Sequence, residues 1–122
     1  QCFAPGIPQI YYVGLLAGEN DIDLLEHTKE GRNINRHYYT LAEIEREVQR
    51  DVVQQLFNLL KFRNTSRAFD GEFSVRALDA NEMEITWHNA AERTSAVMRA
   101  DTQAKTFSIV ETVDGVSREI FL

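Results

Sequence analysis

The segment from Glu30 to His37 contains several side chains that can donate hydrogen bonds to a ligand. Its sequence is EGRNINRH, in which Gly31 permits backbone conformations that other residues avoid. Arg32 presents a planar fork of donors that can bind a carboxylate and sugar hydroxyls together, and Arg36 and His37 add further donors. The residues alone support two interpretations equally: a substrate-binding loop, or a loop whose arginines pair with neighbouring acids and only stiffen it.

Acidic residues gather ahead of this segment, at Glu19, Asp21 and Asp23. Carboxylate oxygens bind hard cations such as Ca²⁺, but the spacing lacks the glycine and the distal glutamate of an EF-hand loop. We therefore favour turn acids, with Asp21 capping a short helix that runs to about Lys29. The three histidines are scattered and there is one cysteine, so we expect no metal site, and nothing indicates a cofactor.

An uncharged stretch precedes these residues and has to position them. Ile7–Val13 is rich in β-branched and aromatic residues, which favours a strand. Its lack of one-sided patterning is typical of a strand covered on both faces, as in a parallel sheet, so we expect Tyr11 and Tyr12 to point to opposite sides. Residues 15–39 then show no clear period, and a connection of that length is more often functional than filler.

A helix is expected to follow, from about Thr40 to Asn64. Thr40 and Glu43 fit a capping box, and apolar residues then recur at helical spacing. Asp51 can start or cap a second helical segment, so we expect a break or kink near Arg50.

After residue 64 the apolar pattern changes from a period of 3.6 to a period of 2, which predicts about five antiparallel strands in a meander or Greek key. Trp87 alternates with Met83 and Ile85, which favours core packing over stacking on a sugar ring. Asp114-Gly115 is a hairpin signal. The predicted strands are residues 73–77, 83–87, 94–100, 106–111 and 116–121.

The composition limits the partners. The chain has 122 residues and a formal net charge of −6, without the basic face that nucleic acid or an anionic membrane requires. Prolines interrupt the uncharged N-terminal stretch and no basic residue precedes it, so neither a membrane-spanning helix nor a secretory signal is expected. The single cysteine, Cys2, fits a core position and a reducing compartment, which predicts a cytoplasmic protein.

The sequence resembles one family, the sucrose phosphorylases and their relatives in the α-amylase group of (β/α)8 enzymes. The likeness is dense from Pro5 to Phe73 and thinner afterwards. Several uncommon stretches recur together, in the family's order and with similar separations. These stretches are PGIPQIYYVGLLAGENDIDLLE, EGRNINRHYYT, LFNLLKFRN and AFDGEF.

The resemblance implies an α+β fragment. Residues 1–64 would be the final strand, active-site loop and helix of an incomplete (β/α)8, or TIM, barrel. In that arrangement Ile7–Val13 is the last barrel strand, and residues 15–39 build the active-site face at its carboxyl end. Residues 65–122 would be a C-terminal antiparallel β-domain.

The resemblance also implies a reaction, the retaining conversion of sucrose and phosphate to α-glucose 1-phosphate and fructose. Two carboxyl groups perform such a transfer, one as nucleophile and one as acid. In the family both lie on earlier strands, so we assign no catalytic residue here. Arg32 matches an arginine that contacts the bound glucosyl unit and pairs with a barrel aspartate. Arg36 and His37 are further substrate-binding candidates, and both could equally hold the loop.

A (β/α)8 barrel needs roughly 250 residues. We therefore expect a fragment that is inactive alone and that associates with the missing N-terminal barrel portion or with a second copy of itself. Two alternatives stay open. One is a stand-alone sugar-binding module that uses Arg32, Trp87 and the tyrosines, and the other is a noncatalytic domain that pairs with another chain through Ile7–Val13.

Overall fold

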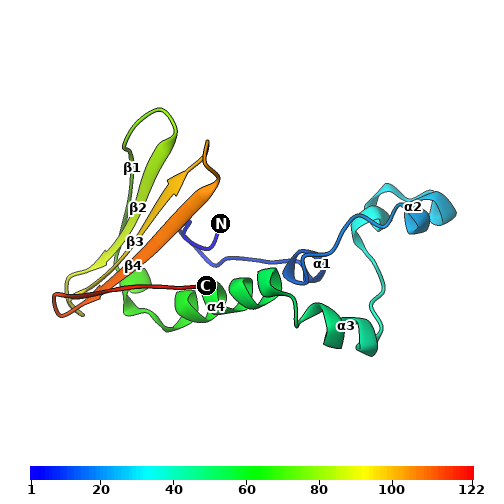
Figure 1. Cartoon of the computed structure of the whole chain (residues 1–122), viewed down its shortest axis with the longest axis horizontal. Coiled ribbons are helices and arrows are strands. Elements are labelled where there is room, and N and C mark those ends of the chain that lie inside the picture. The colour runs from blue at the N-terminus through cyan, green and yellow to red at the C-terminus, as the bar shows by residue number, and fades with distance from the viewer. The chain divides into compact units, whose positions relative to one another are not determined.

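The computed structural model describes all residues from Gln1 to Leu122, in two compact units (Figure 1). Residues 1–6 and 60–122 form the sheet unit, and residues 7–59 form the loop unit. None of the helices is long and apolar enough to cross a bilayer. The helices are α1 (Tyr12–Leu15), α2 (Ile22–Thr28), α3 (Leu41–Glu47) and α4 (Asp51–Thr65), with 3-10 helices η1 (Gly31–Asn35) and η2 (Arg67–Asp70).

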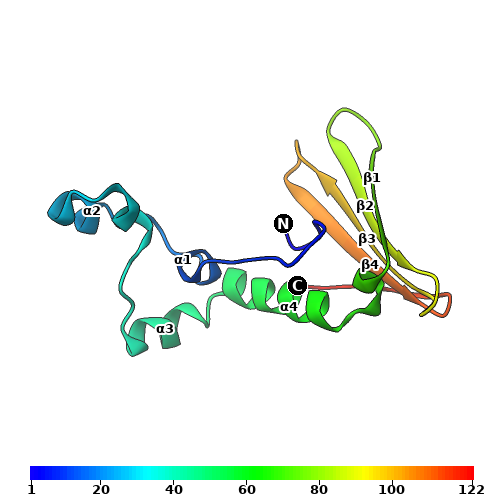
Figure 2. The ribbon, with the colours of Figure 1, turned by 180° about the vertical axis from the view of Figure 1, so that it is seen from behind.

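The sheet unit contains five antiparallel strands in the order β1-β2-β3-β4-β5, so each strand pairs with its neighbour in the sequence. This confirms the predicted sheet and selects the meander over the Greek key. Figure 2 shows the same sheet from behind. Each strand starts at its predicted position or one residue before it. The strands are β1 (Glu72–Ala77), β2 (Glu82–Asn89), β3 (Thr94–Asp101), β4 (Thr106–Val113) and β5 (Val116–Glu119).

The core of the sheet unit is aromatic and centres on Trp87. The indole Nε1 of the buried Trp87 donates a hydrogen bond to the backbone carbonyl of Phe3 at 2.8 Å. The ring of Phe69 meets that of Phe3 edge to face at 5.2 Å, a favoured aromatic geometry. Cys2 is also buried. Trp87 is therefore a core residue, as its alternation with Met83 and Ile85 predicted, and Cys2 occupies the core position expected for a lone cysteine.

Gly71 joins η2 to β1 at a point where two backbone segments nearly touch. A Cβ atom at Gly71 would lie 2.1 Å from the carbonyl oxygen of His88, on the partner strand β2. Only glycine fits there without a backbone shift.

The predicted helix at residues 40–64 is two helices. The hydroxyl of Thr40 accepts from the backbone N–H of Glu43, and the Glu43 carboxylate accepts from the N–H of Thr40. This reciprocal capping box starts α3. The helix ends at Glu47, and α4 begins at Asp51. The break lies where it was expected, beside Arg50.

The strand predicted at Ile7–Val13 is not formed. Residues 7–11 lie outside regular secondary structure, and Tyr12 begins α1. A strand needs hydrogen-bonding neighbours, and all five strands of this chain pair with one another in the sheet. The prediction that Tyr11 and Tyr12 point to opposite sides is also wrong, because at a helix start successive side chains do not alternate. Their ring centroids are 4.6 Å apart.

Candidate functional site

The residues between 15 and 39 fold into two short elements, α2 and η1. Asp21 begins α2, since its Oδ1 accepts from the backbone N–H of Leu24 at 2.8 Å, as the sequence predicted. Lys29 ends the helix in a left-handed conformation, with φ at +56°. The backbone N–H of Asp21 donates to the carbonyl of Ile34 at 2.6 Å, which brings the end of η1 back to the start of α2. The segment is thus a closed loop.

Arg32 lies on η1, in the middle of this loop. Its guanidinium donates two hydrogen bonds to Oε2 of Glu30, both at 3.3 Å. The side chain of Arg32 is nevertheless 68% exposed. An exposed pair of this kind between near neighbours contributes little stability, roughly 0–1 kcal/mol. The donors of Arg32 are therefore accessible to a ligand.

Arg36 follows η1 directly and is exposed. Its backbone N–H donates to the carbonyl of Asn33 at 3.1 Å. No hydrogen bond or ion pair joins Arg36 to Arg32 or to His37. The three candidate residues thus share one segment but have separate surroundings.

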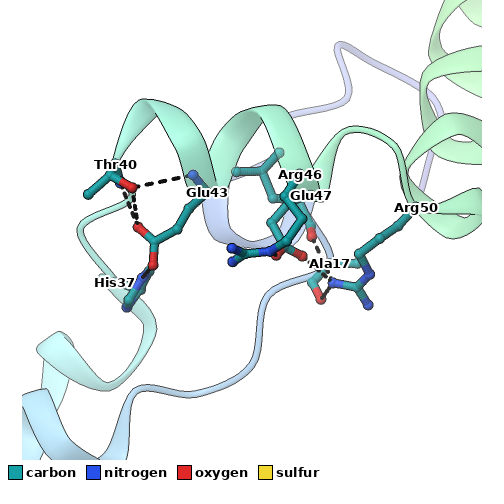
Figure 3. A network of polar contacts seen from close by, with 8 residues as sticks. Ala17, His37, Thr40, Glu43, Arg46, Glu47 and Arg50 are labelled. Atoms are coloured by element: carbon teal, nitrogen blue, oxygen red, sulfur yellow. Dashed lines mark hydrogen bonds and ion pairs between the residues drawn. The ribbon is translucent and has the colours of Figure 1, made fainter.

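His37 has the densest surroundings of the three. Its Nδ1 lies 2.7 Å from Oδ2 of Asp21, and its Nε2 lies 3.5 Å from Oε1 of Glu43. The ring of Tyr39 stands edge to face against it at 4.6 Å. The hydroxyl of Tyr12 donates to the backbone carbonyl of His37 at 3.1 Å. Figure 3 shows His37 aimed at the Glu43 carboxylate, which also holds Thr40.

These contacts change the proton affinities of all three groups. The hydrogen bond with Asp21 raises the pKa of His37, and the same bond lowers the pKa of the Asp21 carboxyl. The pKa of Glu43 is also lowered, first by the backbone N–H of Thr40 and then by the Thr40 hydroxyl. The charged forms of all three side chains are therefore favoured together.

An open groove of about 810 Å³ lies beside this cluster, within the loop unit. Arg50 lines it, and donates to the carbonyl of Ala17 at 3.2 Å and to the Glu47 carboxylate at 2.9 Å (Figure 3). Sequence reasoning gave Arg50 no functional role. The spacing of Glu47 and Arg50 at a helix end could have predicted their ion pair. No local pattern predicts the contact of Arg50 with Ala17, which lies 33 positions away in the sequence.

Comparison with known proteins places this geometry in a family context. No family model matches the chain. The sucrose phosphorylase of Streptococcus mutans is 48% identical over 121 residues, which are 98% of this chain and 25% of that protein. The sucrose phosphorylase of Bifidobacterium adolescentis is 54% identical over 87 residues, 71% of this chain and 17% of that protein.

A solved structure agrees with the sequence matches. The crystal structure of sucrose 6F-phosphate phosphorylase from Thermoanaerobacter thermosaccharolyticum superposes with a TM-score of 0.93 at 42% identity, covering 100% of this chain and 25% of that chain. The chain spans about a quarter of the length of these relatives. In sequence and in fold, this chain is therefore related to the sucrose phosphorylases and their close relatives, over about a quarter of their length.

Proposed function

We propose that this chain is part of a retaining α-glucoside phosphorylase, which converts sucrose and phosphate to α-glucose 1-phosphate and fructose. The observation that carries the proposal is the 48% identity to a sucrose phosphorylase across 98% of this chain. Such a match includes the loop with the candidate residues, together with its supporting helices. The substrates of the complete enzyme would be an α-glucoside and phosphate, with no cofactor, in the cytoplasm.

Residues 1–64 would complete a (β/α)8 barrel as its last βα unit, and residues 65–122 would form the C-terminal β-domain. The state of Ile7–Tyr11 supports this. The segment forms no strand in the structure, and the Ile7 side chain is 97% exposed. Parallel barrel strands from the rest of the protein would supply the hydrogen-bonding neighbours and the apolar cover that this segment lacks.

Arg32 would contact the glucosyl unit, as the resemblance implies, and its exposed donors at the middle of the loop are accessible to such a ligand. Arg36 and His37 stay candidates for the same substrate site. The acids around them are engaged in structural roles. Asp21 caps α2 and Glu43 caps α3. The nucleophile and the acid of the reaction would lie on earlier barrel strands, as the family resemblance implies.

The decisive experiment exchanges the matching stretch of the Streptococcus mutans enzyme for this chain; we call the product the exchange enzyme. The exchange enzyme should release glucose 1-phosphate from sucrose and phosphate. This chain alone should not, since it lacks both catalytic carboxyl groups. A folded exchange enzyme without activity, or turnover by the isolated chain after host enzymes are removed, would contradict the proposal.

A sugar-binding module is the second candidate, supported by the exposed Arg32 and by the exposed tyrosines Tyr11 and Tyr38. Trp87, which that alternative also requires, is buried in the sheet unit and does not face a ligand. Calorimetric titration of the isolated chain with glucose and with sucrose separates the two functions. Saturable binding would favour the module, and its absence is expected for part of an enzyme.

A further inference from the structure

The starting observation is that His37 joins two carboxylates that already cap helices. Asp21 uses Oδ1 to cap α2 and Oδ2 to bind Nδ1 of His37. Glu43 uses Oε2 to hold the N–H of Thr40 and presents Oε1 to Nε2 of His37. Neither carboxylate belongs to a metal-holding cluster. His37 is thus the single side chain that links the start of α2 to the start of α3.

The imidazolium form of His37 fits this arrangement better than either neutral tautomer. Both neighbours are ionised carboxylates, which accept and cannot donate. The imidazolium donates from both ring nitrogens, whereas a neutral imidazole has one nitrogen that can only accept. That nitrogen would face a carboxylate oxygen without a proton between them. The geometry therefore couples closure of the link to protonation of His37.

The segment that this link closes is the one that carries Arg32. Residues 22–36 lie between the two ends of the Asp21–His37 pair, which is 2.7 Å long. Two further bonds hold the segment, from the N–H of Asp21 to the carbonyl of Ile34 and from Nδ2 of Asn33 to Oγ1 of Thr28. Loss of the His37 link would release the segment that carries Arg32 from the start of α3 and leave only these bonds to close it.

Other charged groups surround the cluster, and those on α3 and the turn after it pair with one another. Arg46 and Arg50 both bind Glu47, at 3.1 and 2.9 Å. The hydroxyl of Tyr12 is directed to the backbone of His37 and not to its ring. The charged or titratable groups that line the groove or stand near the cluster come from every element around it. They are, from the α2 side, Glu19, Asp21 and Asp23, from α1 Tyr12, from the loop Arg36, Tyr38 and Tyr39, and from α3 and the turn after it Glu43, Arg46, Glu47 and Arg50.

We propose that His37 is a positioning residue, whose imidazolium ties together the carboxylates of Asp21 and Glu43 and so holds the Arg32 loop in its working position. The effect of His37 on activity rests on the proposed function. The contact of His37 with Asp21 and Glu43 does not. A loop residue misplaced by about 1 Å can lower the rate about a hundredfold.

The pH dependence follows from the shifted groups. The pKa of His37 is raised above 6.5, so its contribution is complete below pH 6.5 and is lost as the pH rises through the raised value. The pKa of Glu43 is lowered from 4.5 and that of Asp21 from 3.8, so their contributions are complete above pH 4.5 and are lost below it as each group protonates. The loop is therefore held best between pH 4.5 and 6.5.

The test compares His37→Asn with a matched control, His27→Asn on the exposed face of α2, in the exchange enzyme and in the isolated chain. Hydrogen exchange of residues 22–36 is measured by mass spectrometry, with exposure times scaled to the intrinsic rate. We expect about tenfold faster exchange in His37→Asn, as for a locally opened segment, and no change in His27→Asn. The wild-type segment should open as the pH rises above 6.5.

A third variant separates the link from the helix cap. Asparagine is as good an N-cap as aspartate, so Asp21→Asn keeps α2 but removes the charge that favours the imidazolium. The imidazole resonances of labelled histidine should then show a His37 titration moved towards 6.5. An unmoved titration, or unchanged exchange in His37→Asn, overturns the proposal. Lost activity without faster exchange also overturns it, because that result indicates direct substrate contact by His37.

The two proposals fail differently. If the exchange enzyme is inactive or tolerates Arg32→Ala, the proposed function fails, while faster exchange in His37→Asn still supports the link. If activity depends on Arg32 but residues 22–36 exchange hydrogen equally slowly with and without His37, the proposed function stands and the positioning role of His37 is overturned.

Discussion

At the scale of residues, Arg32 and Arg36 form a natural comparison. They lie four positions apart, both are exposed, and only Arg32 pairs with a side chain, that of Glu30. An arginine that binds substrate makes charge-assisted hydrogen bonds which strengthen as water is excluded. An arginine that only faces solvent makes no comparable contribution to substrate binding or turnover. The exposed fraction alone does not distinguish these roles, and kinetics can.

Arg32→Ala in the exchange enzyme should lower kcat/KM more than Arg36→Ala does. Truncating one partner of a buried, charge-assisted contact costs about 2–5 kcal/mol, which corresponds to a loss of tens to thousands of fold. Steady-state phosphorolysis of sucrose measures both variants. Equal and small losses would show that Arg32 serves only its pair with Glu30.

A second residue pair concerns stability. The Glu111 carboxylate lies on the core face of β4, 4% exposed, and Arg118 of β5 donates to its Oε2 from Nε and a terminal nitrogen, at 2.9 and 2.6 Å. The strand register puts the two residues directly opposite each other. Because the acceptor is buried and charged, this pair should matter more than a surface pair.

Arg118→Ala should therefore destabilise the sheet unit by about 1.5–3 kcal/mol, the range for a hydrogen bond to a charged group. The control is Arg93→Ala, which breaks an exposed pair with Asp114 of similar length, 3.1 Å, and should cost no more than about 1 kcal/mol. Urea denaturation compares the free energies of unfolding. Similar losses for both would mean that solvent reaches Glu111 in solution.

At the scale of elements, the junction between η2 and β1 depends on the absence of one carbon atom. Gly71 brings the chain against the backbone of His88, and η2 packs on β2 and β3 through buried Phe69. Backbone atoms cannot rotate away as a flexible side chain can. A substitution here must therefore displace the start of β1 or the strand beside it.

Gly71→Ala should lower stability by about 1–3 kcal/mol through overpacking. Gly31→Ala is the matched control, because a Cβ atom at Gly31 meets nothing within 4 Å. Its effect should be within about 0.5 kcal/mol, as for surface substitutions. Thermal melting followed by circular dichroism measures both. A Gly71→Ala protein as stable as Gly31→Ala would show that the junction relaxes without cost.

At the scale of the whole chain, exposed apolar side chains are numerous. Burying a side chain the size of isoleucine stabilises by about 1.5–3 kcal/mol, and a domain of ordinary size is stable by only about 5–15 kcal/mol. Several such positions left in water therefore favour association with whatever can cover them. The most exposed are Ile7, Tyr38, Leu41, Val116 and Phe121.

The isolated chain should consequently associate, either with a second copy or with a supplied N-terminal barrel portion. Light scattering after size exclusion, over a range of concentrations, measures this. Ile7→Lys should reduce association, since a charge at a pairing segment opposes strand addition. A monodisperse monomer with residues 7–13 ordered would be the contrary result, because it would show that this segment needs no partner.

Much of the fold could be predicted because it is encoded locally. Alternation marked the five strands, Asp114-Gly115 marked a hairpin turn, and Thr40 with Glu43 marked the start of α3. Asp114 and Gly115 have positive φ angles, +51° and +82°. Aspartate and glycine adopt such angles in tight hairpin turns more readily than other residues do. Each of these patterns lies within a few neighbouring positions and does not depend on residues far away in the sequence.

Other features of the fold depend on residues that are far apart in the sequence and meet only in the folded chain. The apolar residues of Ile7–Val13 favour a strand, yet a strand forms only beside another strand, and this chain pairs its own five among themselves. Glu111 and Arg118 become partners through the register of β4 and β5. His37 reaches Asp21 across 16 positions, and no spacing rule connects them. Local patterns therefore determined where the helices and the sheet strands begin. The pairing of charged side chains and the conformation of Ile7–Val13 depended on which residues lie next to them in the folded chain.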